Sequence, residues 1–480
     1  MIHKNFIGNQ WVGAAAGETV PVVDPSNGQA YAEIARSRRV DIDAAVSAAR
    51  AAYAGAWGRM APAARSRLLW RIAAALLDRG DELARIESRD TGKPLRQAKA
   101  DAAAVARYFE FYAGAVDKLH GETIPYPRDF TVFTVREPHG VTGHIIPWNY
   151  PLQIFGRSVG AALAAGNACV VKPAEDACLS LLELAEIAAG VGLPEGALNV
   201  CTGLGPEAGA DLAAHPGIDH ISFTGSPTTG RAVAQAAAAH FAPVTLELGG
   251  KSPQIVFSDA DIDAALPVLL GAIVQNAGQT CSAGSRLLVQ RAIYSDLLGR
   301  LGELFEATRT GPASDDPDCG PLINARQLAR VRRFLEEAEE SPITVVAQGK
   351  LDNSAPAAGF YQPPVLLGNV PPAHRLAQEE VFGPVLAAIP FETEAGAIAI
   401  ANATPFGLVA GIWTQDGGRQ MRLARAVRAG QVFVNNYGAG GGVELPFGGT
   451  GHSGFGREKG FEAMYGFTTL KTVAIRHGSS

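Results

Sequence analysis

Cysteine is scarce in this sequence. It contains five cysteines among 480 residues, at positions 169, 178, 201, 281 and 319. No two of them form a CxxC pair, none has a spacing typical of a metal site, and their number is odd. These features argue against a disulfide framework and predict no bound metal. We therefore expect a reduced cytoplasmic protein with free thiols.

The sequence also lacks an excess of positive charge and any long apolar run. Lys and Arg total 41 against 47 Asp and Glu, and no basic stripe is visible, so nucleic acid is not an expected partner. No apolar run approaches the roughly 20 residues that span a bilayer. The initial MIHKNFIGNQW lacks the apolar core of a signal peptide, so we expect no membrane association. The length predicts two or three globular domains.

The first third of the chain changes pattern twice. Residues 4–36 read as short strands and turns, and residues 40–116 have the apolar spacing of helices. Residues 121–143 alternate like two strands joined around Pro138-His139-Gly140, which predicts an exposed hairpin. Residues 467–476 alternate in the same way. The two segments could pair and extend a sheet of a neighbouring subunit, or each could be an ordinary edge strand.

Strands and helices alternate from residue 141 to residue 257, which predicts a parallel, doubly wound α/β sheet. The same alternation returns with longer helices after residue 287 and predicts a second α/β domain. Polar residues follow several of the expected strands. Because ligands bind at the carboxyl ends of strands in such sheets, these turns are candidate binding sites.

Two of these turns suggest a nucleotide. FTGSPTTGR places Gly225 and Ser226 where a strand meets a helix, so backbone N–H groups could approach a phosphate. VVKPAED places Lys172 and Glu175 after an earlier strand, where a carboxylate could bind ribose hydroxyls and repel a 2′-phosphate. Together they favour NAD over NADP. The alternatives are tight packing at the first turn and a surface ion pair at the second.

The stretch NAGQTCSAGSR surrounds Cys281 with small and polar residues, whereas a packing cysteine has bulky apolar neighbours. Upstream, Glu247 of LELGGKSP precedes a Gly-Gly pair and could lie beside the sulfur. A cysteine with a nearby carboxylate suggests covalent catalysis followed by base-assisted hydrolysis. Without this context, Cys281 would be read as a core residue and Glu247 as a surface charge.

Eight motifs, in this order, resemble those of the aldehyde dehydrogenase superfamily over nearly the whole chain. They are PWNYP at 147–151, VVKPAE at 170–175, FTGSPTTGR at 223–231, LELGGKSP at 246–253, NAGQTCSAGSR at 276–286, EEVFGPV at 379–385, PFGG at 446–449 and SGFGRE at 453–458. The resemblance implies an α/β fold with a Rossmann-like cofactor domain, an α/β catalytic domain and a small β oligomerisation domain. The implied boundaries are 1–118 with 141–249, then 250–449, and 119–140 with 466–480. A homodimer or homotetramer is expected.

The resemblance also implies a mechanism. Cys281 would attack the aldehyde, Asn149 and the Cys281 N–H would form the oxyanion hole, and Glu247 would activate water against the thioester. Glu380 and Phe382 would hold the nicotinamide ribose of NAD. The implied cofactor residues are Ile146, Pro147, Trp148, Lys172, Glu175, Gly225, Ser226, Leu248, Gly249, Glu380 and Phe382. For Trp148, core packing and a wall of the cofactor site both remain open.

Two positions depart from the family pattern. Many members carry a lysine directly after the position of Arg157, where it is thought to communicate with the glutamate matching Glu458. Here that position is Ser158, which puts a proton path through this pair in doubt. Gly451 replaces a second lysine and leaves its loop more flexible. Neither change touches the expected chemistry of the cysteine.

The substrate is the least determined feature. Arg157 stands where members that act on succinic semialdehyde carry a carboxylate-binding arginine, but their second arginine is Gln275 here. With Tyr150 and Glu444 as further candidates, we expect an aldehyde that carries a carboxylate or another polar group. An internal ion pair of Arg157, with Glu444 or another acid, is the alternative.

Other functions are weighed against this expectation. A betaine- or amino-aldehyde dehydrogenase remains open. A CoA-acylating enzyme usually lacks the glutamate that is present here as Glu247. A thiol hydrolase without NAD would need neither Glu175 nor Glu380, and a non-catalytic binding or structural protein would need none of the catalytic residues.

Overall fold

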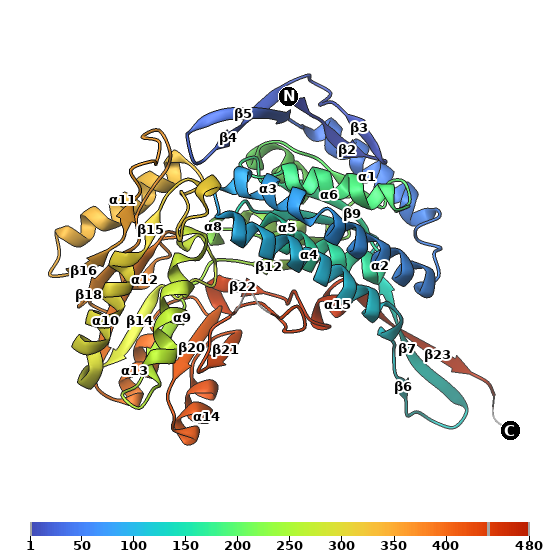
Figure 1. Ribbon diagram of the computed structural model, residues 1–480. Coiled ribbons are helices and arrows are strands. Elements are labelled where there is room, and N and C mark those ends of the chain that lie inside the picture. The colour runs from blue at the N-terminus through green and yellow to red at the C-terminus, as the bar shows by residue number, and fades with distance from the viewer. Residues whose placement is uncertain (1, 439–441, 479–480) are drawn as a thin grey trace.

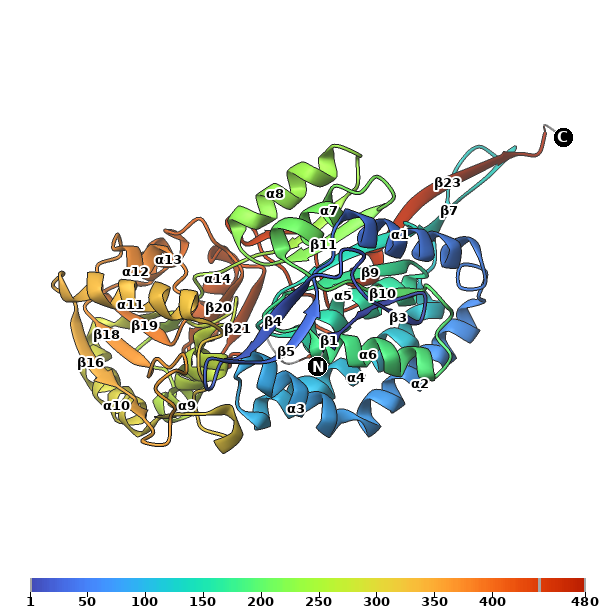
Figure 2. The same cartoon turned by 90° about the horizontal axis from the view of Figure 1, so that it is seen from above.

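The computed structural model describes residues 2–438 and 442–478, which form two α/β lobes and a projecting β arm. In Figure 1 the first lobe, blue to green, lies beside the second lobe, yellow to orange, and the arm extends away from the first lobe. Figure 2 shows the same separation from above. Residues 439–441 and 479–480 of the predicted domains lie outside the described residues.

The first lobe is built on an eight-stranded sheet in the order β22-β12-β11-β8-β9-β10-β2-β3, and its central five strands are parallel. These strands are almost continuously buried, as expected where helices cover both faces. The strands are β2 (Asn5–Ile7), β3 (Gln10–Val12), β8 (Val141–Ile146), β9 (Ala168–Pro173), β10 (Leu198–Val200), β11 (His220–Thr224), β12 (Val244–Glu247) and β22 (Gly454–Phe455). The doubly wound sheet predicted for this region is confirmed.

Helices cover this sheet. Helix α5 begins with Pro151 at its first turn and ends at Gly166, whose φ of 100° is left-handed, and nearly every residue between is buried. A Cβ atom on Gly156 would lie 2.8 Å from the Tyr108 ring, so glycine allows helix α4 to pack closely on α5. The helices are α1 (Arg39–Ala54), α2 (Pro62–Asp78), α3 (Gly80–Thr91), α4 (Leu95–Ala115), α5 (Pro151–Ala165), α6 (Leu179–Gly190), α7 (Ala210–Ala213), α8 (Pro227–Ala238) and α15 (Glu462–Gly466).

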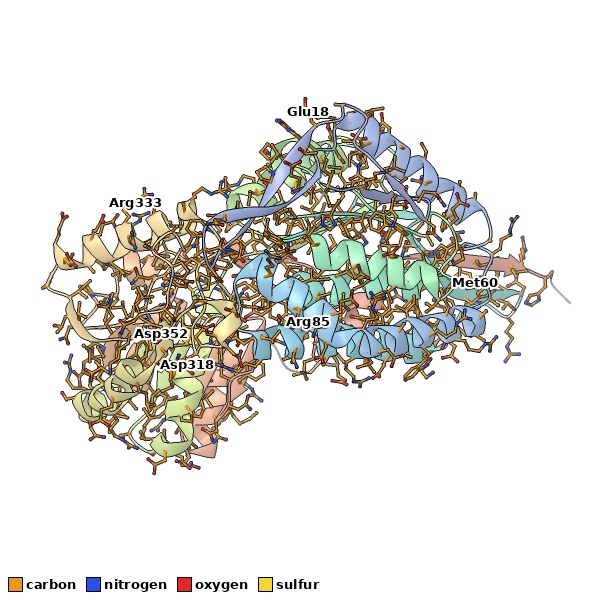
Figure 3. The ribbon with its side chains drawn as sticks, turned by 45° about the horizontal axis from the view of Figure 1, so that its top comes forward. Glu18, Met60, Arg85, Asp318, Arg333 and Asp352 are labelled. Atoms are coloured by element: carbon orange, nitrogen blue, oxygen red, sulfur yellow. The ribbon has the colours of Figure 1, made fainter. Side chains whose placement is uncertain are left out.

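The second lobe holds a seven-stranded sheet in the order β16-β18-β19-β14-β13-β20-β21, antiparallel only at β16. Its strands are β13 (Pro253–Val256), β14 (Arg286–Gln290), β16 (Thr344–Gln348), β18 (Val365–Gly368), β19 (Val385–Phe391), β20 (Val409–Trp413) and β21 (Gln431–Val434). Its helices are α9 (Ile262–Val274), α10 (Tyr294–Ala307), α11 (Ala325–Glu339), α12 (Arg375–Gln378), α13 (Glu394–Asn402) and α14 (Gly417–Ala426). Figure 3 places Asp318, Arg333 and Asp352 in this lobe, and Glu18, Met60 and Arg85 in the first.

Small sheets complete the fold. Near the N-terminus, a three-stranded sheet has the order β1-β5-β4, as the strand-and-turn pattern predicted. Its strands are β1 (Ile2–His3), β4 (Thr19–Asp24) and β5 (Gln29–Ala35), and a separate pair is formed by β15 (Arg309–Thr310) and β17 (Lys350–Leu351). No helix in the described part of the chain is long and apolar enough to cross a bilayer.

The arm is a three-stranded sheet of β6 (Thr123–Ile124), β7 (Phe130–Pro138) and β23 (Thr468–Arg476). β23 pairs with β7 along nine residues, so the predicted pairing of these two distant segments is confirmed. The predicted hairpin around Pro138-His139-Gly140 is wrong. The reason is burial: β8 is almost wholly buried and pairs with β9 and β11 in the main sheet, whereas β7 is half-exposed and belongs to the arm.

Candidate active site

The candidate site lies where the chain passes from the first lobe to the second. Four neighbouring parallel strands, β9, β8, β11 and β12, end at one edge of the first sheet. β12 ends at Glu247, which lies beside Thr224, the last residue of β11. Residues 248–252 then lead directly into β13 of the second sheet. Side chains from both lobes can therefore meet at this edge.

A cavity of about 700 Å³ lies between the lobes. Asn149, Tyr150 and Arg157 line it from the first lobe, and Cys281 lines it from the second. The predicted residue Glu444 is not among the described lining residues, and its carboxylate pairs at the surface with Arg107, 2.5 Å away. Three of the predicted substrate and catalytic residues of the first lobe thus share one cavity with the cysteine.

The loop before Cys281 has a strained backbone. Asn276 and Ala277 have φ angles of 50° and 53°, a left-handed conformation that costs non-glycine residues about 1–3 kcal/mol each. Gly278 continues the left-handed turn at a φ of 70°, and a Cβ atom there would collide with the carbonyl oxygen of Gly383. The cysteine is half-buried at the end of this turn. The strain persists because surrounding groups hold the loop at several points.

Asn149 supplies the most direct of these contacts. Its side-chain Nδ2 donates to the backbone oxygen of Gln279 at 3.0 Å, and the backbone oxygen of Asn149 accepts from Asn276 Nδ2 at 2.9 Å. The neighbouring Tyr150 hydroxyl lies 2.8 Å from Thr280 Oγ1. An amide nitrogen carries two hydrogens, so Asn149 keeps one donor for a further acceptor near the cysteine. A free amide hydrogen of this kind is what an oxyanion donor needs.

The surroundings of Cys281 favour its neutral thiol form. Burial raises its pKa to about 12, and the Arg157 guanidinium opposes the rise. The carboxylates of Glu380 and Glu247 act in the same direction as burial. Because the thiolate is the nucleophile, reaction at this sulfur must depend on removal of its proton.

Glu247 is buried, and neither of its carboxyl oxygens has a hydrogen-bond partner. Burial raises its pKa well above the usual value, Arg157 opposes the rise, and Glu458 adds to it. A Cβ atom on Gly448 would lie 2.8 Å from Glu247 Oε1, so glycine is needed where the chain passes this close to the carboxyl. A buried, unpartnered carboxyl with a raised pKa is suited to exchange protons with a water or a substrate group.

Arg157 forms a buried ion pair. Its Nε lies 2.5 Å from Glu458 Oε2, and its Nη2 donates to Thr224 Oγ1 at 3.2 Å. Ser222 Oγ also donates to Glu458, at 2.6 Å. Ser158, which replaces the family's lysine, lies 3.0 Å from His144 Nδ1. An internal ion pair, one of the two alternatives for Arg157, is therefore present, but with Glu458 instead of Glu444, while Arg157 still lines the cavity.

Lys172 lies buried near the end of β9, and the half-buried Glu175 follows this strand. Lys172 Nζ contacts Glu175 Oε2 at 2.9 Å. Burial opposes ionisation of Glu175, but Lys172 outweighs it and lowers the pKa of this carboxyl. Across the edge, Ser226 caps helix α8 by accepting from Thr229 N at 3.2 Å. An ionised carboxylate after β9 and a helix N-terminus after β11, on either side of β8, fit the ribose and phosphates of a nucleotide.

Glu380 and Phe382 lie on the other side of the cysteine loop. Glu380 Oε1 accepts from Gly250 N at 2.9 Å, and burial raises the pKa of this carboxyl to about 7. A Cβ atom on Gly249 would collide with the same carboxyl, so glycine is needed for this approach. The Phe382 ring meets Trp148 edge-to-face at 5.3 Å between centroids. This second carboxylate could accept hydrogen bonds from the other ribose of a dinucleotide.

Four further predicted cofactor residues have mainly structural contacts. Ile146 is buried at the end of β8, and Leu248 packs where a Cβ atom on Gly230 would contact it at 2.6 Å. Gly225 donates its N–H to Glu247 O at 3.0 Å, which joins the ends of β11 and β12. Pro147 follows Ile146 in the chain and is half-buried.

Comparison with known proteins places the chain in a family. The profile described as "Aldehyde dehydrogenase family" matches residues 11–473. The chain belongs to the aldehyde dehydrogenase family. The hydroxyisobutyraldehyde dehydrogenase of Mycolicibacterium austroafricanum is 41% identical over 474 residues, which cover 98% of this chain and 93% of that protein.

Solved structures of the family have the same fold. A crystal structure from Burkholderia cenocepacia has a TM-score of 0.98 and 69% identity, covering 99% of this chain and 100% of that one. The NAD+ complex of an aldehyde dehydrogenase from Bacillus cereus has a TM-score of 0.96 and 37% identity, covering 99% and 97%. The predicted family, α/β fold class and reaction class, oxidation of an aldehyde, are confirmed.

Sequence reasoning missed several residues at this aldehyde dehydrogenase site. Gln279 holds Asn149, and the Tyr437 hydroxyl donates to Ser282 O at 2.5 Å beside the cavity. Lys459 lines the cavity, and burial lowers its pKa to about 8. Gln279 stands inside the cysteine motif and could have been noticed. For Tyr437 and Lys459 no local pattern marks the side chain as part of a site.

Proposed function

We propose that this protein oxidises an aldehyde to a carboxylic acid, with NAD as cofactor, through a thioester on Cys281. The observation that supports the proposal is the contact between Asn149 and the cysteine loop in a cavity that both line. Glu247 ends the adjacent strand with an unpartnered carboxyl. These are the parts needed for attack, oxyanion stabilisation and hydrolysis.

In the first step, the Cys281 thiol releases its proton to water, the sulfur attacks the aldehyde carbon, and the carbonyl oxygen becomes an oxyanion. Asn149 Nδ2 and the Cys281 backbone N–H donate to this oxygen. Removing one such donor in other enzymes costs about 10²–10³ in kcat, so Asn149 is expected to contribute substantially. The strained loop keeps the sulfur in place while the substrate changes geometry.

Residues of both lobes would hold the cofactor. Glu175 and Lys172 would bind the adenosine ribose, Ser226 and the start of α8 the phosphates, and Glu380 with Phe382 the nicotinamide ribose. When bound, NAD supplies the acceptor for the hydride that leaves the substrate carbon. Glu175 and Glu380 would each take ribose hydroxyls, and Glu175 would repel a 2′-phosphate.

Hydrolysis of the thioester would use Glu247. Its raised pKa makes the carboxylate a stronger base than an exposed one, and it would act on a water molecule beside the thioester. The carboxylate would take a proton from that water as it attacks the thioester carbon. The acid product and the free thiol of Cys281 then complete the cycle.

We further propose an aldehyde that carries a carboxylate or another polar acceptor. The cations Arg96, Arg157 and Lys459 line the cavity, whereas Asp318 is the one acidic side chain among its described lining residues. This balance disfavours the cationic betaine and amino aldehydes. Because Arg157 is already paired with Glu458, its charge is partly offset, and a polar acceptor would bind through its remaining donors.

The test of both proposals is a panel of aldehydes assayed through NADH absorbance, with NAD, with NADP and with CoA added. We expect a semialdehyde acid to have a higher kcat/KM than betaine aldehyde or a neutral aldehyde of equal length. Arg157→Leu should raise KM for the acid more than for the neutral aldehyde. Equal effects on the two would contradict the substrate proposal, and absence of NADH with every aldehyde would contradict the proposed reaction.

Assembly and location are proposed as well. The arm of β7 and β23 exposes the apolar side chains of Leu470 and Ile475. We propose that a homodimer or homotetramer buries them against another subunit. In this proposal residues 119–140 and 466–480 serve oligomerisation, residues 1–118 and 141–249 bind NAD, and residues 250–449 carry the cysteine. All five cysteines are free, which supports a cytoplasmic location. Light scattering would give the number of subunits.

A further inference from the structure

A charged cluster is buried behind the candidate site, and the mechanism above does not use it. Lys93, in the turn between α3 and α4, contacts Glu87 Oε1 at 2.9 Å and Asp101 Oδ2 at 2.5 Å through its Nζ. The side chains of Lys93 and Glu87 have no exposed surface, and that of Asp101 is 3% exposed. We refer to Lys93, Glu87 and Asp101 as the buried triad.

The remaining oxygens of the triad reach the first turn of helix α5. Glu87 Oε2 accepts from the backbone N–H of Leu152 at 3.0 Å, and Asp101 Oδ1 accepts from Gln153 Nε2 at 2.5 Å. A carboxylate that accepts from the first turn of a helix is favoured by the free N–H groups and the dipole there. The two acids therefore hold α5 at its starting point.

The ammonium group acts on the residue just before this turn. Lys93 Nζ lies 4.3 Å from the centre of the Tyr150 ring, within the range of a cation–π contact. The Tyr150 hydroxyl in turn contacts Thr280 Oγ1. Tyr150 directly follows Asn149, so contacts of the triad surround the residues that carry the Asn149 amide. A nearby side chain, Gln97, accepts from Asn276 N at 2.9 Å and ties the same region to the cysteine loop.

Stability alone does not explain a buried triad. Taking charges out of water is costly, and well-packed apolar residues of similar size are often as stabilising as a buried ion pair. What charged groups add is direction: each hydrogen bond of Glu87 and Asp101 fixes an angle as well as a distance. The four contacts of these two acids join the Lys93 turn to the first turn of α5.

We propose that Lys93, Glu87 and Asp101 form a positioning cluster that sets the orientation of the Asn149 amide toward the aldehyde oxygen. The proposal rests on the oxyanion role assigned to Asn149 under the proposed function. Lys93 balances the two acids, and these hold residues 152 and 153. Asn149 Nδ2 then has one hydrogen on Gln279 O and the other toward the substrate.

Removing the lysine should disturb this arrangement through charge. Burial raises the pKa of Glu87, and the Lys93 ammonium opposes the rise. Without Lys93 the Glu87 carboxyl would take up a proton, and a neutral acid is a weaker acceptor for the Leu152 N–H. The first turn of α5 would then lose its fixed direction, and Asn149 with it.

The test is a double-mutant cycle between Lys93→Met and Asn149→Ala, measured as kcat with NAD and a saturating aldehyde. We expect Lys93→Met alone to lower kcat about 10- to 100-fold, as for partial loss of an oxyanion donor. In the Asn149→Ala background, the same substitution should lower kcat less than about threefold, because the amide it positions is gone. An equal fold-change in both backgrounds, or no loss in the first, would overturn the proposal.

Two further variants keep the result interpretable. Lys99→Met, on α4, removes an exposed lysine paired with Asp81 at 3.0 Å and should leave kcat unchanged. If Lys93→Met does not fold, the charge-balanced Lys93→Met/Asp101→Asn takes its place in both backgrounds, with the same expected and opposing outcomes. The rate of Cys281 alkylation by iodoacetamide checks that each variant keeps the loop.

Failure of the proposed function has a different signature. If Asn149→Ala itself leaves kcat at the wild-type value, the oxyanion role of Asn149 is wrong. Asn149→Ala could instead lower kcat, while Lys93→Met lowers kcat by the same factor in the wild-type and Asn149→Ala backgrounds. In that case the oxyanion role stands and the positioning role of the triad is wrong.

Discussion

Arg157 Nε lies 2.5 Å from Glu458 Oε2, and this buried pair links a side chain of the cavity wall to Ser222 of β11. The two charges of the pair have opposite effects on the candidate base: Arg157 lowers the pKa of Glu247, and Glu458 raises it. Ser158, the residue after Arg157, lies against His144, and Arg157 itself pairs with Glu458. Burial has the largest effect on the pKa of both Glu247 and Cys281, and Arg157 opposes it at both groups.

Glu458→Gln should shift the pH dependence of thioester hydrolysis. The substitution removes a negative charge that raises the pKa of Glu247 and leaves Arg157 uncompensated, so the pKa falls. The base is ionised above its pKa, and the acid limb of the pH–kcat profile should therefore move to lower pH. An unpaired buried arginine also destabilises the fold, by about 3–5 kcal/mol. A limb that stays in place while the melting temperature falls would contradict this electrostatic role.

Alkylation of Cys281 should depend steeply on pH. Its pKa of about 12 lies far above neutrality, so the thiolate fraction grows about tenfold for each pH unit. The rate of inactivation by iodoacetamide should rise by that factor between about pH 7 and 9. The Cys281→Ala variant is the control, since it should take up no label at this site and show no aldehyde oxidation. A plateau near neutral pH would show a thiolate already formed in the resting enzyme.

Glu247→Gln should separate the two halves of the reaction. The amide cannot take a proton from water, so hydride transfer should proceed once and hydrolysis should then stall. Rapid mixing should show a burst of NADH close to one equivalent per cysteine, followed by a slow steady state. Loss of the burst with normal steady turnover would mean that Glu247 serves the first step instead.

Glu175→Gln should weaken the preference for NAD over NADP. The carboxylate, ionised because Lys172 lowers its pKa despite burial, would repel a 2′-phosphate. The neutral amide removes this repulsion and leaves Lys172 without its partner, so the ratio of kcat/KM for the two cofactors should narrow. The control is Glu183→Gln. Glu183 lies on α6 and its carboxylate pairs with Arg79, so this change should leave the ratio of kcat/KM for the two cofactors as it was.

Gly278→Ala should damage the cysteine loop. A Cβ atom there meets the Gly383 carbonyl, and the residue has a left-handed φ of 70°. We expect a loss of about 1–3 kcal/mol in the free energy of unfolding together with a lower kcat. Gly299→Ala is the matched control, because this glycine lies in α10 with open space around it. It should stabilise the protein by about 0.5–1 kcal/mol, as alanine does inside a helix, without changing kcat.

Local sequence was enough to predict much of this protein. Periodicity gave the alternation of strands and helices in the first sheet, because burial on both faces makes each strand a short apolar run. The small residues around Cys281 and the glycines after Glu247 marked the loop and the crossing between lobes. The positions of Asn149 and Glu380 came from family motifs, since neither residue type is unusual at a turn.

Contacts between residues that are far apart in the sequence could not be predicted in this way. The hairpin prediction failed because residues 130–138 and 141–146 are close in sequence but belong to different sheets, and only burial of the second segment decides this. In the same way, Arg157 lies 301 positions from Glu458, and no local pattern connects them. Side-chain pairing over such distances depends on how whole helices and strands pack.

The sequence by itself therefore determined which chemical groups this protein has and in which turns they stand. Only the tertiary structure decided which of them meet: Glu444 pairs with Arg107 at the surface, and Lys93 gathers two acids behind Asn149. The physical reason is that turn chemistry and strand burial act over a few residues, whereas ion pairs and hydrogen bonds in the core join groups that folding alone brings within 3 Å or so, as between Lys93 and Glu87 at 2.9 Å.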